Sequence, residues 1–235
     1  MKNQRILLII PAYNEEQNIL NTCKSIIQYN NEFDYIVVND GSKDNTGKLC
    51  RENNLNHVNL INNLGIGGAV QAGYKYAFDN NYDIAIQFDG DGQHDIDDIE
   101  KLIKPIITDE IDFVIGSRFL ATKNGFKSTR MRRFGITIIS KMIKIVTGEK
   151  ITDPTSGYRA CNRKVIEKFA LEYPREYPEP ITVVNLIKNK YKLSEIPVEM
   201  KERVAGESSI KTWKTVYYMV NVALSIIVIS MRRYK

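Results

Sequence analysis

Two aspartates that follow an apolar run are the residues of this chain best placed to do chemistry. Asp89 and Asp91 stand in the sequence DGDGQH, directly after the largely apolar residues 84–88. Side chains two apart on extended backbone point the same way, so the two carboxylates converge, and Gly90 and Gly92 let the chain bend tightly. Converging carboxylates repel unless a cation lies between them, and their hard oxygens suit Mg²⁺ or Mn²⁺, which commonly bridge to phosphates. The alternative is an acidic turn without a metal.

Polar residues follow two further apolar runs. Asp40, in the sequence NDGSKDNT, is placed to accept hydrogen bonds from a nucleobase or a ribose. The neighbouring Ser42, Asp44 and Asn45 are alternatively helix caps. The sequence PAYNE at residues 11–15 offers an aromatic face and a carboxylate, or is simply a strand-to-helix turn.

Two common phosphate-binding motifs are excluded. The stretch NLGIGGA at residues 63–69 would need a glycine where Val70 stands to match GxGxxG. Residues 41–48 place Gly47 one position late for the phosphate loop of ATPases, and Leu49 stands where that loop needs Ser or Thr. A dinucleotide-dependent dehydrogenase and a phosphate-loop ATPase are therefore both rejected.

The elements that must position these residues alternate between strands and helices. Near-continuous apolar runs predict strands that are buried on both faces, which favours a mostly parallel sheet with helices on both sides. In such sheets ligands bind at the carboxyl ends of the strands, where the polar residues fall. The expected strands are Arg5–Ile10, Tyr35–Asn39, His57–Ile61, Ile84–Phe88, Phe113–Gly116 and Ser194–Met200, and the expected helices are Glu15–Tyr29, Thr46–Asn54, Gly68–Asn80, Asp97–Thr108, Met131–Thr147 and Thr215–Met231.

Composition agrees with a folded α/β protein whose two halves differ in charge. The 235 residues are 43% hydrophobic and 26% charged, which excludes a disordered or collagen-like chain. Residues 1–110 hold 9 Lys/Arg and 17 Asp/Glu, a net charge of −8, whereas residues 111–235 hold 24 and 11, a net of +13. The acidic and basic halves suggest two electrostatically distinct tasks. Three separated cysteines imply neither a disulfide framework nor a zinc site and fit a reducing cytosol.

Taken together, the motifs resemble family 2 glycosyltransferases of the GT-A fold. Any one of them is weak evidence, but seven occur in order over nearly the whole chain. Within the family the sequence is most similar to the dolichyl-phosphate mannosyltransferase and polyprenyl-phosphate glycosyltransferase branch, in which DGDGQH and GSRF both occur. The seven motifs are PAYNE, VNDGSKDNT, NLGIGGA and DGDGQH, followed by Gly116–Phe119, Asp153–Arg159 and Arg203–Ser209.

The resemblance implies a fold, a reaction and a set of site residues. It implies a GT-A domain over residues 1–210, followed by a C-terminal amphipathic helix over residues 211–235. The QxxRW signature of processive synthases is absent, which favours a single transfer over polymerisation. The resemblance further implies an inverting, metal-dependent transfer from a UDP- or GDP-sugar. By the resemblance, the nucleotide is held by Pro11, Tyr13, Glu15, Asp40 and Asp89, and the metal, Mg²⁺ or Mn²⁺, and the donor diphosphate by Asp89, Asp91 and Gln93.

The acceptor decides which further residues are needed. An alcohol acceptor needs a base, for which Asp153 is the candidate, although this residue alternatively caps a turn or holds Arg159. A phosphate monoester is largely ionised at pH 7 and needs cations instead. The planar donor fork of arginine suits phosphate, so we expect a polyprenyl phosphate of the dolichyl or undecaprenyl type as the acceptor. The candidate cations are Arg118 and Arg203 in the catalytic set, with Arg118, Arg130, Arg132 and Arg133 for the acceptor phosphate.

A membrane surface is the expected location of such an acceptor. Residues 215–231 carry no charge and would form a helix about 26 Å long, shorter than the ~30 Å hydrocarbon core. Basic residues flank this segment, so a helix lying on the membrane, or docked on a small membrane-protein partner, is favoured over a span. The expected location is cytoplasmic, on the inner face of the membrane. A core helix or an interface between copies of the chain is the alternative.

The sequence leaves other functions open. One is transfer to a saccharide acceptor in cell-surface polysaccharide synthesis. Another is a non-catalytic module that binds a nucleotide sugar, against which the intact Asp89, Asp91 and Gln93 set argues. Nucleic-acid binding is not expected, because the positive charge is not interleaved with an aromatic strand platform.

Overall fold

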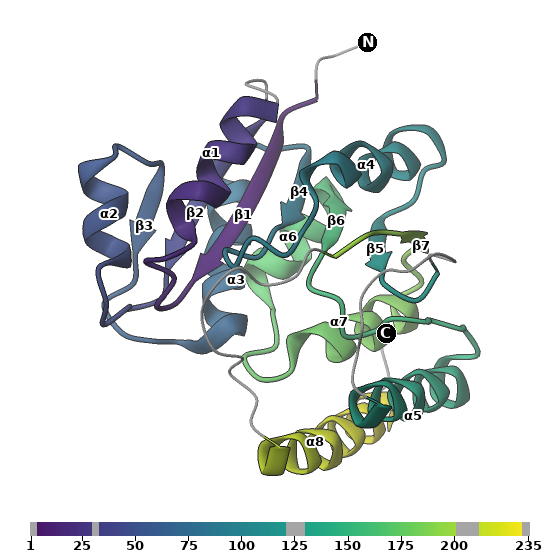
Figure 1. The fold of residues 1–235 in the computed structure, drawn as a ribbon. Helices are drawn as coiled ribbons and strands as arrows, with labels where there is room; N and C mark the ends of the chain where they lie inside the picture. The colour runs from purple at the N-terminus through teal and green to yellow at the C-terminus, as the bar shows by residue number, and fades with distance from the viewer. Residues whose placement is uncertain (1–3, 30–32, 121–129, 201–211, 232–235) are drawn as a thin grey trace.

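One mixed sheet forms the centre of the protein. The computed structural model describes residues 4–29, 33–120, 130–200 and 212–231. Within these ranges a 7-stranded sheet has the order β3-β2-β1-β4-β6-β5-β7 (Figure 1). Its strands are β1 (Ile6–Ala12), β2 (Asp34–Asn39), β3 (His57–Asn59), β4 (Ile84–Gln87), β5 (Phe113–Ser117), β6 (Arg159–Asn162) and β7 (Leu193–Pro197).

The sheet is parallel except at β6. This strand pairs antiparallel with β4 on one side and with β5 on the other, whereas the remaining pairs are parallel. Strands β4 and β5 therefore run in the same direction, and the carboxyl ends of β1, β2, β4 and β5 lie at one edge. The mostly parallel α/β sheet predicted from the sequence is confirmed. Strand β6 was not predicted, because Arg159 and Asn162 at its ends leave no apolar run to mark it.

Helices cover both faces of this sheet. Alternate residues of a strand point to opposite faces, so Leu8 packs with α1 and α4, and Leu7 packs on the other side with α3, α6 and α7. The helices are α1 (Ile19–Tyr29), α2 (Thr46–Glu52), α3 (Gly65–Asp79), α4 (Ile99–Thr108), α5 (Arg130–Thr147), α6 (Arg163–Leu171), α7 (Pro178–Lys188) and α8 (Thr212–Met231).

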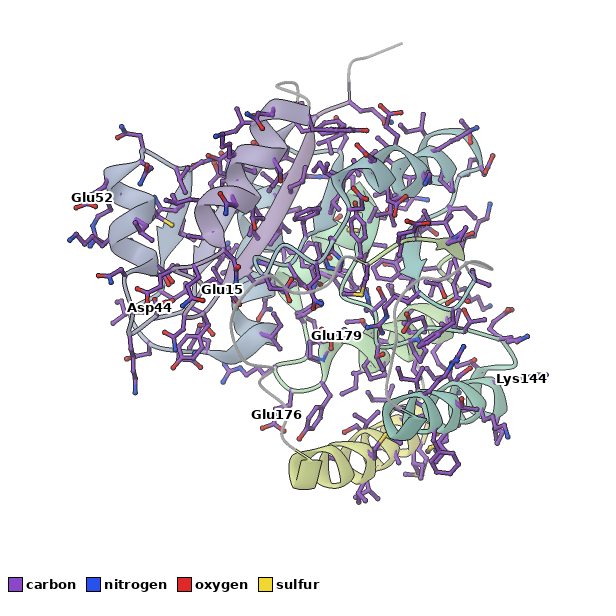
Figure 2. The ribbon with its side chains drawn as sticks, viewed as in Figure 1. Glu15, Asp44, Glu52, Lys144, Glu176 and Glu179 are labelled. Carbon is purple, nitrogen blue, oxygen red and sulfur yellow. The ribbon has the colours of Figure 1, made fainter. Side chains whose placement is uncertain are left out.

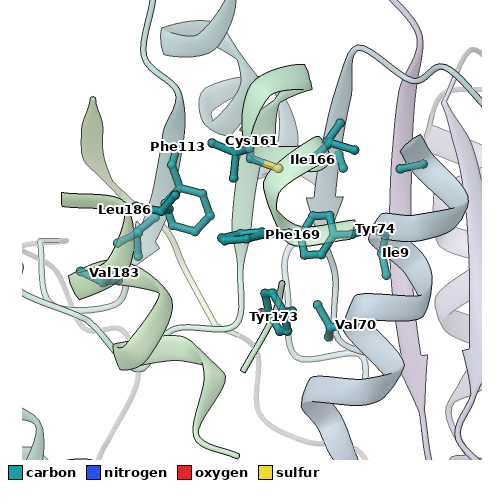
Figure 3. Close-up of a cluster of buried hydrophobic side chains, with 14 of the residues drawn as sticks. Ile9, Val70, Tyr74, Phe113, Cys161, Ile166, Phe169, Tyr173, Val183 and Leu186 are labelled. Carbon is teal, nitrogen blue, oxygen red and sulfur yellow. The ribbon is translucent and has the colours of Figure 1, made fainter. Parts of the chain in front are cut away.

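An aromatic cluster fixes α3 and α6 against the sheet (Figure 3). The ring centroid of Phe169 lies 5.0 Å from that of Tyr74 and 5.0 Å from that of Tyr173. Helix α3 approaches β1 so closely that a Cβ atom on Gly73 would lie 2.2 Å from Cγ2 of Ile9. This close packing holds the amino end of α3 beside the carboxyl end of β2.

The structure changes two expectations about helices. Helix α1 begins at Ile19 rather than Glu15, because residues 16–18 form a turn in which the Asn18 N–H donates to the Glu15 carbonyl at 3.0 Å. Helix α7 begins inside the proline-containing segment, with Pro178 in its first turn, where a missing N–H costs nothing. Neither α6 nor α7 was predicted. The domain boundary at residue 210 lies outside the described residues and stays a prediction.

Helices α5 and α8 form an outer layer. They pack side by side, and α7 lies between them and the sheet (Figure 1). Helices α5 and α8 approach each other closely, since a Cβ atom on Gly135 of α5 would lie 2.7 Å from Sδ of Met219 of α8. Among the described helices, none combines the length and the apolarity needed to cross a bilayer.

Candidate active site

Polar residues from four strands meet at one edge of the sheet. Tyr13 and Asp40 follow the last residues of β1 and β2, and Asp89 and Arg118 follow β4 and β5. Since these strands run in the same direction, their carboxyl ends lie together, as the sequence analysis expected. Figure 2 labels Glu15 and Asp44 near the β1 and β2 end of this arrangement and Glu179, from the start of α7, nearer the centre.

Asp89 is held between a histidine and a glycine. Nε2 of His94 lies 3.0 Å from Oδ2 of Asp89, and the Asp89 side chain keeps 33% of its exposure. On another side, a Cβ atom on Gly157 would lie 2.8 Å from the same Asp89 oxygen. The backbone around Asp89 thus leaves its carboxylate little freedom to turn.

His94, which is not distinctive in the sequence, is packed into the centre of this site. Its ring stacks on Tyr158 with centroids 4.4 Å apart and contacts Phe88 edge-on at 5.6 Å. The residue is 5% exposed. The sequence placed His94 beside the metal loop, but only the fold turns it back onto Asp89.

The surroundings of Asp89 favour its charged form. Burial would raise the pKa of this carboxyl, but the charge and hydrogen bonding of His94, with help from Gln87 and Arg118, outweigh burial and lower the pKa. Asp89 is therefore ionised at neutral pH, which a metal ligand requires.

The donor set at this loop fits a magnesium or manganese ion. Asp91 is partly exposed, and its Oδ1 accepts a hydrogen bond from the Gln93 N–H at 3.1 Å. In the described part of the chain, no cluster of three or more His, Cys, Asp or Glu side chains could hold a metal alone. Mg²⁺ usually needs only one or two protein carboxylates when substrate phosphates and water complete its shell. Asp89 and Asp91 supply two carboxylates and Gln93 an amide oxygen, which are ligands of the type that Mg²⁺ binds.

Asp40 is nearly buried beside the start of α3. It is 3% exposed, and its Oδ1 accepts a hydrogen bond from the Leu64 N–H at 2.7 Å. Burial raises the pKa of this carboxyl, and hydrogen bonds from the backbone of Leu64 and Gly65 partly oppose the rise. The Asp40 N–H donates to the Ala12 carbonyl at 2.9 Å, which ties the ends of β1 and β2 together.

The loops after β1 and β2 are locked to each other. The N–H groups of Glu15 and Glu16 donate to Oγ1 of Thr46 at 2.9 Å and to Oδ2 of Asp44 at 3.1 Å. Asp44 therefore bridges two loops instead of only capping α2. Asn45 is the N-cap residue of that helix but makes no side-chain capping bond.

Two predicted nucleotide-binding residues lie at the end of β1. Tyr13 has 42% of its surface exposed, and Pro11 is buried within the strand.

A buried ion pair joins Arg118 to Asp153. Nε and Nη2 of Arg118 donate to the two Asp153 oxygens at 2.6 and 2.7 Å, and the Arg118 backbone N–H donates at 3.1 Å. Asp153 has no exposed surface, and Arg118 is 8% exposed. From the sequence, Asp153 is a candidate base, a turn cap or a partner of Arg159. The structure pairs it with Arg118, and this geometry favours a positioning role over proton transfer.

Arg159, the first residue of β6, is buried apart from this ion pair. It is 1% exposed and donates to backbone carbonyls, at 2.9 Å to Pro154 and at 3.0 Å to Glu179. Its Nη1 also donates to Oγ1 of Thr182 at 2.8 Å. Burial raises the pKa of the nearby Glu179 carboxyl, although the charge of Arg159 partly offsets this effect. Arg159 therefore fixes the start of α7 against the loop at residues 153–157.

The structure brings two of the predicted phosphate-binding arginines together. Cζ of Arg118 lies 5.7 Å from the centroid of the Phe119 ring, and Cζ of Arg133 lies 5.6 Å from the same centroid. Arg130 and Arg132 belong to the first turn of α5, but their side chains are not among those described. Arg203 lies outside the described residues.

Comparison with known proteins identifies the family. Residues 7–170 match the model described as "Glycosyl transferase family 2". The chain is 35% identical over 218 residues to a UDP-N-acetylglucosamine–dolichyl-phosphate N-acetylglucosaminyltransferase of Methanococcus voltae, covering 85% of this chain and 86% of the relative. It is 28% identical over 215 residues to an undecaprenyl-phosphate mannosyltransferase of Micrococcus luteus, covering 87% and 86%.

A solved structure shares the fold. Glucosyl-3-phosphoglycerate synthase from Mycobacterium tuberculosis, crystallised with Mn²⁺, UDP and phosphoglyceric acid, superimposes with a TM-score of 0.74 at 16% identity, covering 99% of this chain and 81% of that one. At this identity the likeness establishes the GT-A fold alone. The family match explains the order of motifs in this sequence: the chain belongs to glycosyl transferase family 2 and is a nucleotide-sugar-dependent glycosyltransferase.

Proposed function

We propose that this enzyme transfers one sugar from a UDP-sugar to a polyprenyl phosphate. The observation that carries the proposal is the loop at residues 153–157. Gly157 at one end of the loop abuts Asp89, and Asp153 at the other end holds Arg118. One short loop thus links the carboxylate expected at the donor diphosphate to a cation suited to an acceptor phosphate.

The hydrogen bonds of Asp40 support uridine as the donor nucleoside. Guanine offers two adjacent donors, N1–H and N2–H, which a carboxylate reads with both oxygens, whereas uracil offers one donor, N3–H. Oδ1 of Asp40 is already engaged by the Leu64 N–H. The arrangement therefore suits a base with a single donor. The name of the Methanococcus voltae relative, which states a UDP-sugar donor, agrees with this proposal.

The acceptor half of the site supports a phosphate nucleophile. A phosphate monoester is largely ionised at pH 7, so it needs orientation and charge compensation more than a base. Arg133 supplies an exposed cation there, and Arg118, whose charge is paired with Asp153, adds guanidinium N–H donors beside the same Phe119 ring. When bound by Asp89, Asp91 and Gln93, a divalent ion would neutralise charge that develops on the leaving diphosphate. Arg118 orients the acceptor oxygen for attack on the face opposite that diphosphate, which inverts the anomeric configuration.

Product analysis tests the proposed function. The enzyme is incubated with UDP-N-acetylglucosamine, UDP-glucose or GDP-mannose, with Mg²⁺ or Mn²⁺, and with either undecaprenyl phosphate or undecaprenol. We expect UDP release and a glycolipid product only with the phosphate, and neither from the Asp89→Asn variant. A product formed equally well on undecaprenol, or on an oligosaccharide instead of the lipid, would refute the proposed acceptor.

We also propose that α5 and α8 lie on the membrane that holds the acceptor. Lys141 and Lys144 of α5 are exposed beside apolar side chains, which suits a surface of anionic headgroups. This contact would hold the enzyme peripherally at the inner face of the membrane. The exposed apolar side chains are Phe134 and Ile145 of α5 and Val220, Leu224, Ile227, Val228 and Met231 of α8.

Flotation with liposomes tests this contact. Ile227 on α8 is 44% exposed, and Ile27 on α1 is 50% exposed, so the two provide a matched pair. We expect wild type and Ile27→Asp to float with vesicles of phosphatidylglycerol and phosphatidylcholine, and Ile227→Asp to remain below. Equal flotation of the two variants, or none by wild type, would contradict the proposal.

A further inference from the structure

We infer that Glu195 is a positioning residue for Arg118, the arginine proposed to bind the acceptor phosphate. Glu195 lies on β7 at the edge of the sheet and was not among the predicted site residues. Its Oε2 accepts a hydrogen bond from the Thr152 N–H at 2.7 Å. Its Oε1 accepts from Oγ1 of Thr152 at 3.0 Å and from the Asp153 N–H at 2.9 Å. Both carboxylate oxygens are thus committed to the start of the loop that carries Asp153.

The same two loop residues also bind the end of β5. Oγ1 of Thr152 lies 2.8 Å from Oγ of Ser117, within hydrogen-bond distance. Asp153 binds Arg118 through both of its carboxylate oxygens. A continuous path of hydrogen bonds therefore runs from Glu195 through residues 152 and 153 to the guanidinium of Arg118.

Burial makes this path rigid. The side chain of Asp153 has 0% of its surface exposed and that of Arg118 has 4%, so neither can turn aside without losing a charged partner. Strands β5 and β7 pair in parallel register, with Ile115 opposite Glu195. Glu195 therefore stands on the same rigid layer that carries Arg118, and it sets where the loop lies relative to that strand.

A glutamine at this position would break the path while keeping its size. An amide has one acceptor oxygen and one NH₂ group, and the NH₂ group would face N–H donors of Thr152 or Asp153. The loop must then shift, and Asp153 shifts with it. Because displacements near 1 Å cost up to about 100-fold in well-oriented sites, we expect the acceptor KM to rise about tenfold or more.

The inference rests on the proposed function, and the experiment separates the two. Transfer from UDP-N-acetylglucosamine to undecaprenyl phosphate is measured for wild type, Glu195→Gln, Arg118→Lys and the double variant. Glu110→Gln is the matched control, because the Glu110 side chain is 89% exposed and pairs with Lys192 away from the site. Binding of UDP with Mn²⁺, measured by calorimetry, reports whether the donor half remains folded.

We expect Glu195→Gln to raise the acceptor KM while the donor KM and UDP binding stay near wild type. In the Arg118→Lys background the same change should have little further effect, since the group it positions has been altered. Unchanged acceptor KM in Glu195→Gln, or an equal loss in both backgrounds, would overturn the inference and leave the proposed function standing. If Glu195→Gln fails to fold, Thr152→Val, which removes the two hydrogen bonds that the Thr152 hydroxyl makes to Glu195 and Ser117, takes its place in the same cycle. Absence of transfer by wild type would remove the proposed function and this inference with it.

Discussion

Replacing Asp153 with asparagine separates the two roles that this residue could have. The change keeps the shape of the side chain but removes the charge that Arg118 meets in a site where the two side chains are 4% and 0% exposed. Breaking a buried ion pair by removing one partner costs about 3–5 kcal/mol, because the remaining charge is left without compensation. For a protein of this size, each kcal/mol lowers Tm by about 2–4 °C, so we expect a fall of about 6–20 °C.

The catalytic consequence follows from the same geometry. If Asp153 positions Arg118, Asp153→Asn and Arg118→Met should both raise the acceptor KM, and the double variant should be little worse than either alone. The assay is transfer to undecaprenyl phosphate below the unfolding temperature, together with thermal unfolding of each variant. A variant Asp153→Asn with wild-type Tm and acceptor KM but a kcat lowered by a thousandfold would refute this reasoning and restore the residue as a general base.

Three further predictions concern the neighbours of Asp89 and Arg159. His94→Phe keeps the stack on Tyr158 but removes the imidazole 3.0 Å from Asp89, so Mn²⁺ affinity in the presence of UDP should fall about 10–100-fold with little change in Tm. Gly157→Ala would place a Cβ atom 2.8 Å from Oδ2 of Asp89 and should raise the donor KM without altering the acceptor KM; an unchanged donor KM would show that the loop yields instead. Burial raises the pKa of Glu179, so ionising this carboxyl destabilises the folded state. The stability is fully present below the unfolded pKa of ~4.3 and is lost as the pH rises through the folded pKa. Glu179→Gln should therefore raise Tm at pH 7 but not at pH 4.

Local patterns were enough to predict the sheet but not all of its members. Apolar runs and turn residues identified β1, β2, β4 and β5, because strands buried on both faces must be apolar throughout. The same rule missed β6, whose residues Arg159 and Asn162 bind a neighbouring loop and cap α6. Prolines obscured α7, since proline opposes a helix interior but suits a first turn.

Some residues of the site were predicted from the sequence, and others were found only in the structure. Tyr13, Asp40 and Asp89 were named from their position after predicted strands, and Arg118 from the motif it shares with the family. The common direction of β1, β2, β4 and β5 places these residues together. Their partners were not found, because His94 and Glu195 act through contacts that no spacing reveals. Glu195 is 42 residues from Asp153 in the chain but within 2.9 Å of its backbone nitrogen.

By itself, the sequence determined which chemistry this protein can carry, because charge, hydrogen-bonding capacity and strand periodicity belong to the residues and their spacing. Only the tertiary structure decided which charged side chains form ion pairs with each other. Asp153 had several possible partners in the chain, and burial beside Arg118 selected one, since two opposite charges removed from water must satisfy each other.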